Sequence, residues 1–382
     1  MKAIVAITIF YTLVRVVTVS PIFRERQIAY FIRPFDESEI TVKKRLAFTS
    51  TDTVITDSIY MLLSEDGMPL AYSADIHTTV CANNECLPVE IEIFWGPTGA
   101  YLGFKLPNGM PLTKEKHIPF SEDEYTQLNK LLANKQSVLL DYEPDELVTP
   151  KKNNAEVDGI SSATIKEIKN VIVPGAVYTC YQLYKIVNGP IAQFISQNTS
   201  KIMTPAFANL LVDSKRKEEI VWLLDRVSLQ DGYYLHLKQK LVETINDLDY
   251  SISFRIRNCL TQEDLDDTVI QHLLLDAFIS SNPVIQLEIM KKLGESNQLD
   301  EKLFIYFSKN LRGFNSNILI YSLQLLSKQN HVDPRVLDYV SELLTSKNKY
   351  LAARAWLFIE ETSAISEKSQ TLKKKYNSNF NQ

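Results

Sequence analysis

The chain has 382 residues, which is too long for one compact core and predicts two domains, or one domain joined to a repeat array. Apolar residues make up 45% of the sequence and charged residues 23%, as in folded globular proteins. The formal net charge of −5 argues against nucleic acid as the main partner, because phosphate binding needs a basic surface.

Residues 1–20 have the pattern of a signal or membrane-anchor segment. Lys2 precedes the apolar run Ala3–Val14, as in a secretory signal. Arg15 interrupts the run, and Pro21 is unfavourable directly after a cleavage site. The alternative is a buried strand at the start of the domain. The signal pattern predicts export to the cell envelope, with the protein either periplasmic or held on the membrane by this segment and facing outside the cytoplasm.

Two of the four cysteines are placed for a cross-strand disulfide. Cys81 and Cys86 lie on either side of Asn83-Asn84, a pair that suits a two-residue type I′ turn because Asn tolerates a positive φ. Such a turn brings the two Cβ atoms close enough to be bridged. The bridge is expected only in an exported protein. Two free thiols, or half of a metal site, are the alternatives, but the sequence has no second CxxC or HxxxH to complete a metal site.

Residues 21–190 are predicted to form an α+β domain. Short apolar or alternating runs, broken by Gly, Pro, Asp and Asn, indicate strands. They are Gln27–Ile32, Thr53–Leu62, Val89–Trp95 and Tyr101–Leu106. Ser121 is a good N-cap for a helix with an acidic first turn, and a second helical pattern runs over Ala176–Val187.

Residues 200–365 carry a repeat of 33 residues, with a less regular unit over 203–227. One helix of each unit starts at an Asn or Asp: Asp249, Asn282, Asn315 and Asn348. The other helix starts at Asp267, Asp300 and Asp333, with apolar positions in register after each cap. A helix hairpin cannot bury its own apolar stripe, so neighbouring units must stack into an array. The polar composition from residue 366 to 382 indicates a disordered tail.

The repeat resembles HEAT-like repeats in its general shape, and neither the ankyrin nor the tetratricopeptide signature. The predicted fold class is therefore an α+β N-terminal domain followed by an all-α HEAT-like helical-repeat solenoid. We expect the array to present a surface to a protein partner.

The segment Asp158-Gly-Ile-Ser161-Ser162-Ala163-Thr164 resembles the attachment motif of flavin-binding domains that carry covalent FMN, such as the FMN-binding subunits of sodium-pumping and Rnf-type electron-transfer complexes. Asp158, Ser161, Ala163 and Thr164 match the family pattern, and Ser162 stands where Gly is usual. The resemblance implies that a flavin transferase joins the Thr164 hydroxyl to the FMN phosphate, and that these five residues surround the cofactor. Whether the flavin is attached or only bound stays open.

A weaker likeness, to bacterial envelope proteins with an FMN-binding-type domain and helical C-termini, extends from about Thr78 to Gly189. The residues that prompt it are Val80-Cys81, Tyr101–Phe104, His117 and Val173–Thr179.

The same segment has a purely structural interpretation. Thr164 and Glu167 have the spacing of a capping box, with Thr164 as N-cap and Glu167 at N3. A helix start also offers free amides to a phosphate, so the two interpretations share one local geometry.

Aromatic side chains could form the walls of a flavin site or belong to the core. They are Tyr178, Tyr181 and Tyr184, three residues apart, with Trp95, Tyr101 and Phe104 on expected strands. Core packing is the commoner role for aromatic residues at such spacing.

Together these patterns predict an extracytoplasmic electron-transfer flavoprotein with FMN on Thr164 and a helical docking surface. The alternative is a non-catalytic envelope scaffold whose helical repeats bind a protein. A hydrolase is a third class, but the sequence has no GxSxG, P-loop, GxGxxG or HExxH motif to support it.

Overall fold

The chain divides into two compact units in the computed structural model, which describes residues 28–49, 56, 58–79, 88–107, 109–150, 162–164, 168–227, 234–327, 332–362 and 366–380. The first unit ends at Pro190 and the second continues from Ile191, and the turns Ser64–Pro69 and Gly96–Ala100 group with the second. Each unit is described by itself.

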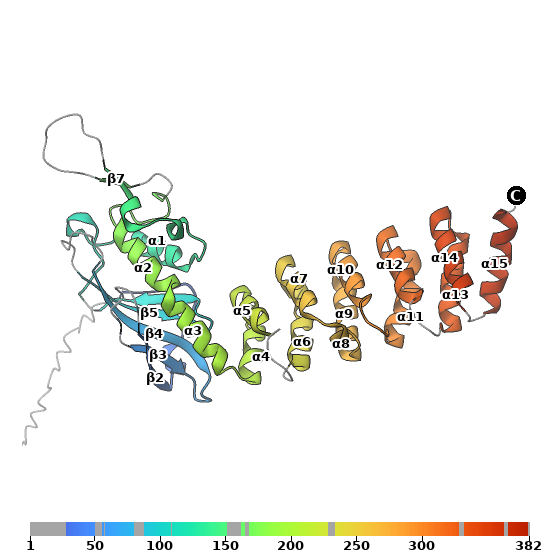
Figure 1. Cartoon of the computed structure of the whole chain (residues 1–382), viewed down its shortest axis with the longest axis horizontal. Coiled ribbons are helices and arrows are strands. Elements are labelled where there is room, and N and C mark those ends of the chain that lie inside the picture. Colours follow the sequence, from blue (N-terminus) through green and yellow to red (C-terminus); the bar gives the residue numbers. More distant parts are fainter. Residues whose placement is uncertain are drawn as a thin grey trace, which may run out of the picture. The chain divides into compact units, whose positions relative to one another are not determined.

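A six-stranded antiparallel sheet forms the first unit, in the order β1-β6-β5-β4-β3-β2 (Figure 1). Its strands are β1 Ala29–Phe31, β2 Val42–Ala47, β3 Ser58–Leu63, β4 Pro69–Thr78, β5 Val89–Trp95 and β6 Tyr101–Lys105. Strands are confirmed in all four predicted regions. β2 and most of β4 were not predicted. A separate two-stranded ribbon pairs β7 Val148–Pro150 with β8 Ser162–Thr164.

Both faces of the sheet carry buried apolar side chains. Leu62, Ala71, Phe94 and Leu102 cluster on one face, and a set that includes Ala74, Ile93 and Phe104 lies on the other. The registers place Ala74 opposite Ile93 and Ile93 opposite Phe104, so the three side chains share a face, and all are fully buried. Tyr125 packs on this face, with its ring centroid 6.3 Å from that of Phe104. Tyr101 donates a hydrogen bond to Asn129 Oδ1 at 2.7 Å.

Two helices complete the first unit: α1 Glu122–Ala133 and α2 Val177–Asn188, which pack against each other. The predicted cap at Ser121 is confirmed, because its hydroxyl accepts from the Glu124 amide while the Glu124 carboxylate accepts from the Ser121 amide. The predicted helix over Ala176–Val187 is confirmed as α2.

The second unit is largely helical, with thirteen α-helices in its described residues. They are α3 Pro190–Lys201, α4 Pro205–Asp213, α5 Lys217–Val227, α6 Tyr234–Glu243, α7 Tyr250–Cys259, α8 Gln262–Leu265, α9 Thr268–Ser280, α10 Pro283–Leu293, α11 Glu301–Asn310, α12 Ser316–Ser327, α13 Pro334–Glu342, α14 Lys349–Glu361 and α15 Glu367–Phe380.

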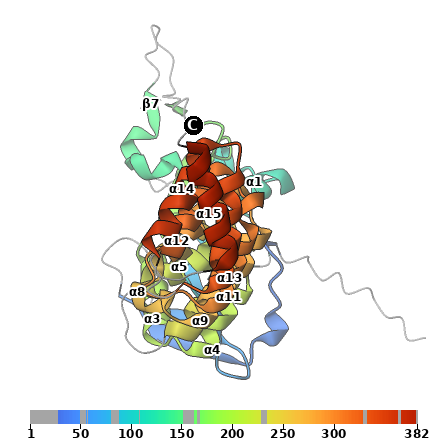
Figure 2. The same ribbon diagram turned by 90° about the vertical axis from the view of Figure 1, so that its right-hand side faces the viewer.

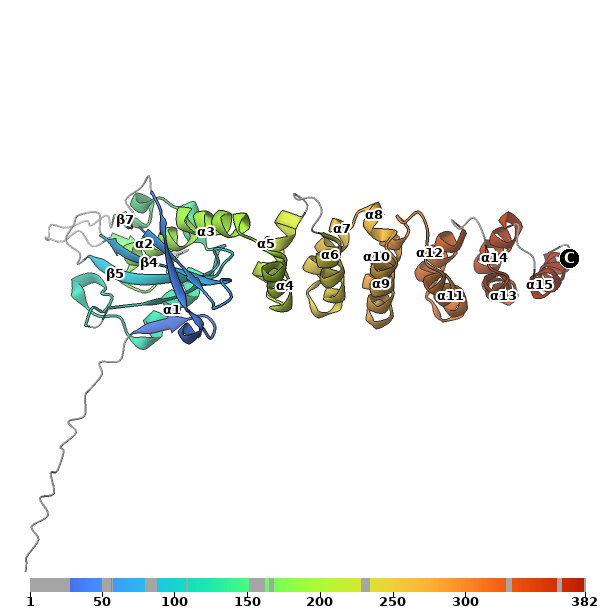
Figure 3. The same cartoon turned by 90° about the horizontal axis from the view of Figure 1, so that it is seen from below.

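Eleven of these helices, all except α3 and α8, pack in two rows (Figure 1). The first row contains α4, α6, α9, α11, α13 and α15, and the second row contains α5, α7, α10, α12 and α14. Each helix contacts its neighbours in its own row, and Figure 3 shows the helices of the two rows following one another in pairs. The largest apolar cluster of this unit lies between the rows.

The predicted helix caps of this region are confirmed. Asp249, Asn282, Asn315 and Asn348 each accept a hydrogen bond from the backbone amide three residues later. Asp267 caps α9, Asp300 caps α11 and Asp333 caps α13 through backbone amides. The core positions that follow these three caps are fully buried: Ile270, Leu303 and Val336, then Leu274, Phe307 and Val340.

Helix forms at both ends of this unit. The chain forms helix again at once after Gly189, as α3. The disordered tail is wrong for residues 366–380, because α15 packs against α13 (Figure 2). Ser369 is buried, and the indole of Trp356 donates to Asn377 Oδ1 at 2.9 Å. These contacts order a helix whose composition is polar.

Candidate functional site

The FMN-like segment lies only partly within the described residues. Asp158 and Ser161 lie outside them. Ser162, Ala163 and Thr164 form strand β8, with Thr164 opposite Val148 and Ser162 opposite Pro150. The backbone at Thr164 is therefore part of an antiparallel ribbon.

The helix predicted to start after Thr164 is not seen in the described residues that follow. Residues 168–171 form turns, with the amides of Val171 and Ile172 both donating to the Ile168 carbonyl. The next helix is α2, which begins at Val177. Residues 165–167 and the side chain of Thr164 lie outside the described part of the chain, so the predicted cap at Thr164 stays a prediction.

The aromatic residues that could form the walls of a flavin site belong mainly to the core. Tyr181 donates to the Tyr142 carbonyl at 3.0 Å, and Tyr184 to the Asn134 carbonyl at 2.8 Å. Trp95 Nε1 donates to the Val187 carbonyl at 2.9 Å. Their polar atoms have protein partners and their rings are buried. Core packing is the role that these contacts favour.

The cysteines fall into two groups. Cys81 and Cys86 lie outside the described residues, and β4 and β5 on either side of them pair with Thr78 opposite Val89. Cys180 and Cys259 are free thiols. Burial raises the pKa of Cys180 to about 12 and that of Cys259 to about 11.

We therefore expect a disulfide between Cys81 and Cys86 in protein isolated from an oxidising compartment, and two inert thiols. Because the thiolate is the nucleophile, a raised pKa suppresses alkylation at Cys180 and Cys259. Peptide mapping of the native protein after iodoacetamide treatment without reductant should find Cys81 linked to Cys86 and the other two unlabelled. Alkylation of Cys81 and Cys86 in the exported protein would contradict the bridge, and cytoplasmic expression serves as the control.

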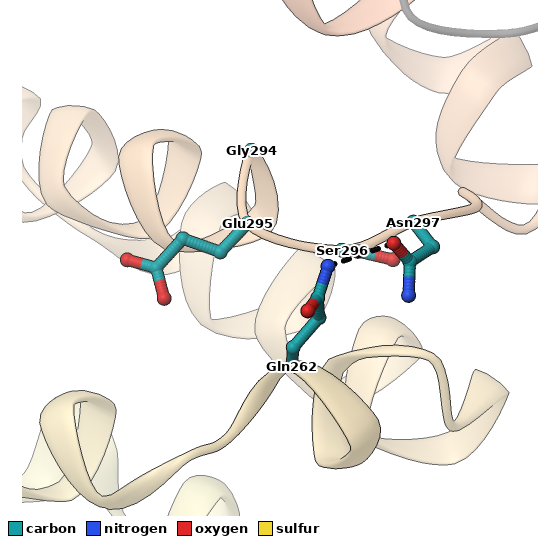
Figure 4. Close-up of a pocket in the computed structure, with 5 residues that line it drawn as sticks. All are labelled: Gln262, Gly294, Glu295, Ser296 and Asn297. Atoms are coloured by element: carbon teal, nitrogen blue, oxygen red, sulfur yellow. Dashed lines mark hydrogen bonds between the residues drawn. The ribbon is translucent and has the colours of Figure 1, made fainter.

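The described residues hold no group of three or more His, Cys, Asp or Glu side chains able to bind a metal ion. One polar hollow, of about 650 Å³, lies between the start of α8 and the loop after α10 (Figure 4). Gln262 donates to Asn297 Oδ1 at 2.7 Å across it, while Glu295 points away (Figure 4) and accepts from Lys292 at 2.6 Å. Nearby, Ser296 donates to Asp266 and lowers the pKa of its carboxyl group. These polar groups bond to one another and join successive helix pairs.

The second row carries the more apolar surface of the helical unit. Five large apolar side chains are exposed on it: Tyr250, Phe254, Val284, Tyr350 and Leu357. Two hollows lie between α10 and α12. One, of about 440 Å³, is lined at the helix starts by residues that include Pro283, Val284 and Leu287, and the other, of about 230 Å³, is lined by Met290 and Tyr321 among others. Exposed apolar side chains beside surface hollows are typical of protein-docking faces.

Comparison of the chain with protein-family models, with curated proteins and with solved structures finds no match. In the described residues, no helix has both the length and the apolar content needed to cross a bilayer, and residues 1–20 lie outside that part of the chain.

Proposed function

We propose that this protein is a scaffold of the cell envelope whose helical unit is a HEAT-like solenoid that binds a protein partner. The observation that carries the proposal is the recurrence of capped helices at 33-residue spacing in two packed rows. Arrays of this kind expose long surfaces because each unit contacts only its neighbours. The docking face in this proposal is the exposed side of the second row.

Partner capture from an envelope fraction tests this function. The tagged full chain should capture a stoichiometric partner after cross-linking. A variant with Phe254, Val284 and Tyr350 changed to serine should lose the partner, because exposed apolar side chains supply much of the contact energy of an interface.

The matched control changes three exposed apolar residues of the first row, Leu210, Val269 and Ile279, to serine. This control should keep the partner. Failure to capture any partner, or equal loss in both variants, rules against docking through the second row.

A second candidate function is electron transfer by an FMN attached to Thr164, with a flavin transferase as an additional partner. The sequence from Asp158 to Thr164 favours it, since four of its residues match the attachment pattern. In this proposal Asp158, Ser161, Ser162 and Ala163 surround the flavin linkage. The flavin supplies the redox chemistry, and the chain positions it.

Intact mass after expression with a flavin transferase tests the second function. Wild type should gain one FMN and a visible flavin band that survives denaturation, while Thr164→Ala should gain neither. Ser162→Gly, which restores the usual family residue, should increase the labelled fraction because glycine lets the enzyme approach the backbone more closely. Thr149→Ala, in the strand paired with β8, is the matched control. Wild-type protein without attached FMN would rule out this second function and leave the scaffold function as the proposal.

A further inference from the structure

Arg257 in α7 breaks an otherwise apolar pattern along the second row. At 33-residue spacing its counterparts are Leu224, Met290, Leu323 and Trp356. Leu224, Met290 and Leu323 are buried in the core. A charged residue at a position that its neighbours fill with apolar side chains is a local conflict, and conflicts of this kind cluster at functional sites.

The two terminal nitrogens of the Arg257 guanidinium are buried without hydrogen-bond partners. Only 2% of the residue is exposed, and neither Nη1 nor Nη2 has an acceptor. Glu288 in α10 is close enough to act on it through its charge, but its carboxylate accepts from Lys291 Nζ at 2.9 Å. Burial lowers the pKa of Arg257, which shows the cost of keeping this cation out of water. A carboxylate brought to this position would offset that cost.

The surface beside Arg257 is aromatic and accessible. Tyr250 and Phe254 are 51% and 41% exposed, and their rings stack with centroids 6.3 Å apart. The guanidinium carbon lies 6.0 Å from the Tyr250 ring centroid. Val284 of α10, which packs against α7, is 62% exposed. Exposed side chains such as that of Tyr250 change rotamer within nanoseconds, and contact with the buried cation requires a movement of this kind.

We propose that α7 and α10 bind an acidic segment of a partner protein, with one Asp or Glu carboxylate on the Arg257 guanidinium and flanking apolar side chains on Tyr250 and Phe254. The planar guanidinium can donate two parallel hydrogen bonds to a carboxylate, which gives the contact direction as well as strength. This inference rests on the proposed docking function and names the chemistry of the partner. The exposed rings of Tyr250 and Phe254 supply contact area, and the buried cation of Arg257 selects for negative charge.

Two fluorescein-labelled libraries of synthetic decapeptides provide the probe. In one, Asp and Glu alternate with Leu and Phe, and in the other Asn and Gln replace the acids. Fluorescence anisotropy should show that the full-length protein binds the acidic library at least about tenfold more tightly than the amide library. Asn and Gln cannot form the desolvated charge pair with Arg257 that Asp and Glu form. Arg257→Met should reduce binding of the acidic library by at least about tenfold.

Two further variants separate the site from general charge. Arg257→Lys keeps the charge without the planar fork and should have intermediate affinity. Arg255→Met removes an exposed arginine from the same helix, where it pairs with Asp225, and should leave the affinity within about twofold. Arg257→Met should fold at least as well as wild type, since Met290 fills the counterpart position.

Equal binding of the two libraries, or unchanged binding by Arg257→Met, overturns the inference. If Glu288→Gln loses stability and neither library binds the protein, Glu288 is the partner of Arg257 within the chain. That result also overturns the acidic-segment inference. The docking function is judged separately. If Arg257→Met captures the envelope partner as wild type does, only the acidic-segment inference fails, whereas absence of any partner removes the docking function.

Discussion

Replacing Trp95 with alanine is expected to destabilise the first unit by about 3–5 kcal/mol, the range for truncating a large buried aromatic side chain. Trp95 is fully buried at the end of β5, and its indole donates to the Val187 carbonyl at 2.9 Å. Val187 lies in the last turn of α2, where carbonyl groups lack helical partners. The variant therefore creates a cavity and also leaves a buried acceptor unsatisfied, which costs about 1–3 kcal/mol in other proteins. Urea unfolding measures the loss of free energy of unfolding. Hydrogen exchange over residues 58–105 shows whether the loss falls on the sheet.

Trp95→Phe separates the two contributions. It keeps most of the ring volume and removes the donor, so we expect a loss of about 1–3 kcal/mol. Exchange in the helical unit, for example in α9 and α12, should not change with either variant if the two units unfold independently. An unfolding midpoint for Trp95→Ala equal to that of wild type would contradict the assignment of Trp95 to the buried core of the first unit.

Helix starts and the apolar faces that follow them could be predicted because their signals are local. A cap such as Asp267 needs only the amide three residues later, and that geometry is set within one turn. The same holds for Ser121 and Glu124 at the start of α1. A spacing of 33 residues then extends this local signal from Asp249 to Asn282, Asn315 and Asn348, and from Asp267 to Asp300 and Asp333.

Elements ordered by distant contacts escaped prediction. β2 contains Lys43-Lys44-Arg45 and lies at the sheet edge, where basic residues discourage pairing with other chains, so its sequence lacks the alternation of a half-buried strand. α15 is mainly polar, and its contacts to the rest of the unit include those of Leu372 and Tyr376 with the apolar core and the ion pair between Lys368 and Glu342. Composition alone does not reveal such contacts.

The candidate sites also divide into what local sequence signals predict and what depends on distant contacts. The sequence at Thr164 suits a helix cap, and only the pairing of Ser162–Thr164 with Val148–Pro150 identifies a ribbon. Arg257 does not stand out from the apolar positions that define the repeat. A comparison of one position across repeats, in which arginine replaces leucine or methionine, was the available signal.

The second large effect is expected at Phe307 in α11. Its side chain is fully buried and meets Phe278 of α9 edge-on, with centroids 5.2 Å apart and an interplanar angle of 84°. It also contacts Tyr306 and Phe314. Phe307→Ala should cost about 3–5 kcal/mol, because a cavity forms and the favourable edge-to-face contacts are lost.

Hydrogen exchange resolved by helix measures this effect and tests the proposed array at the same time. In a stack whose units contact only their neighbours, protection should fall most in α11 and next in α9 and α13, with little change in α4. Lys309→Ala, at an exposed position of the same helix, should change stability by less than about 0.5 kcal/mol. Equal loss of protection in every helix would mean that the unit unfolds as one cooperative block. The recurrence of caps would then reflect a repeated sequence without the nearest-neighbour energetics of a solenoid.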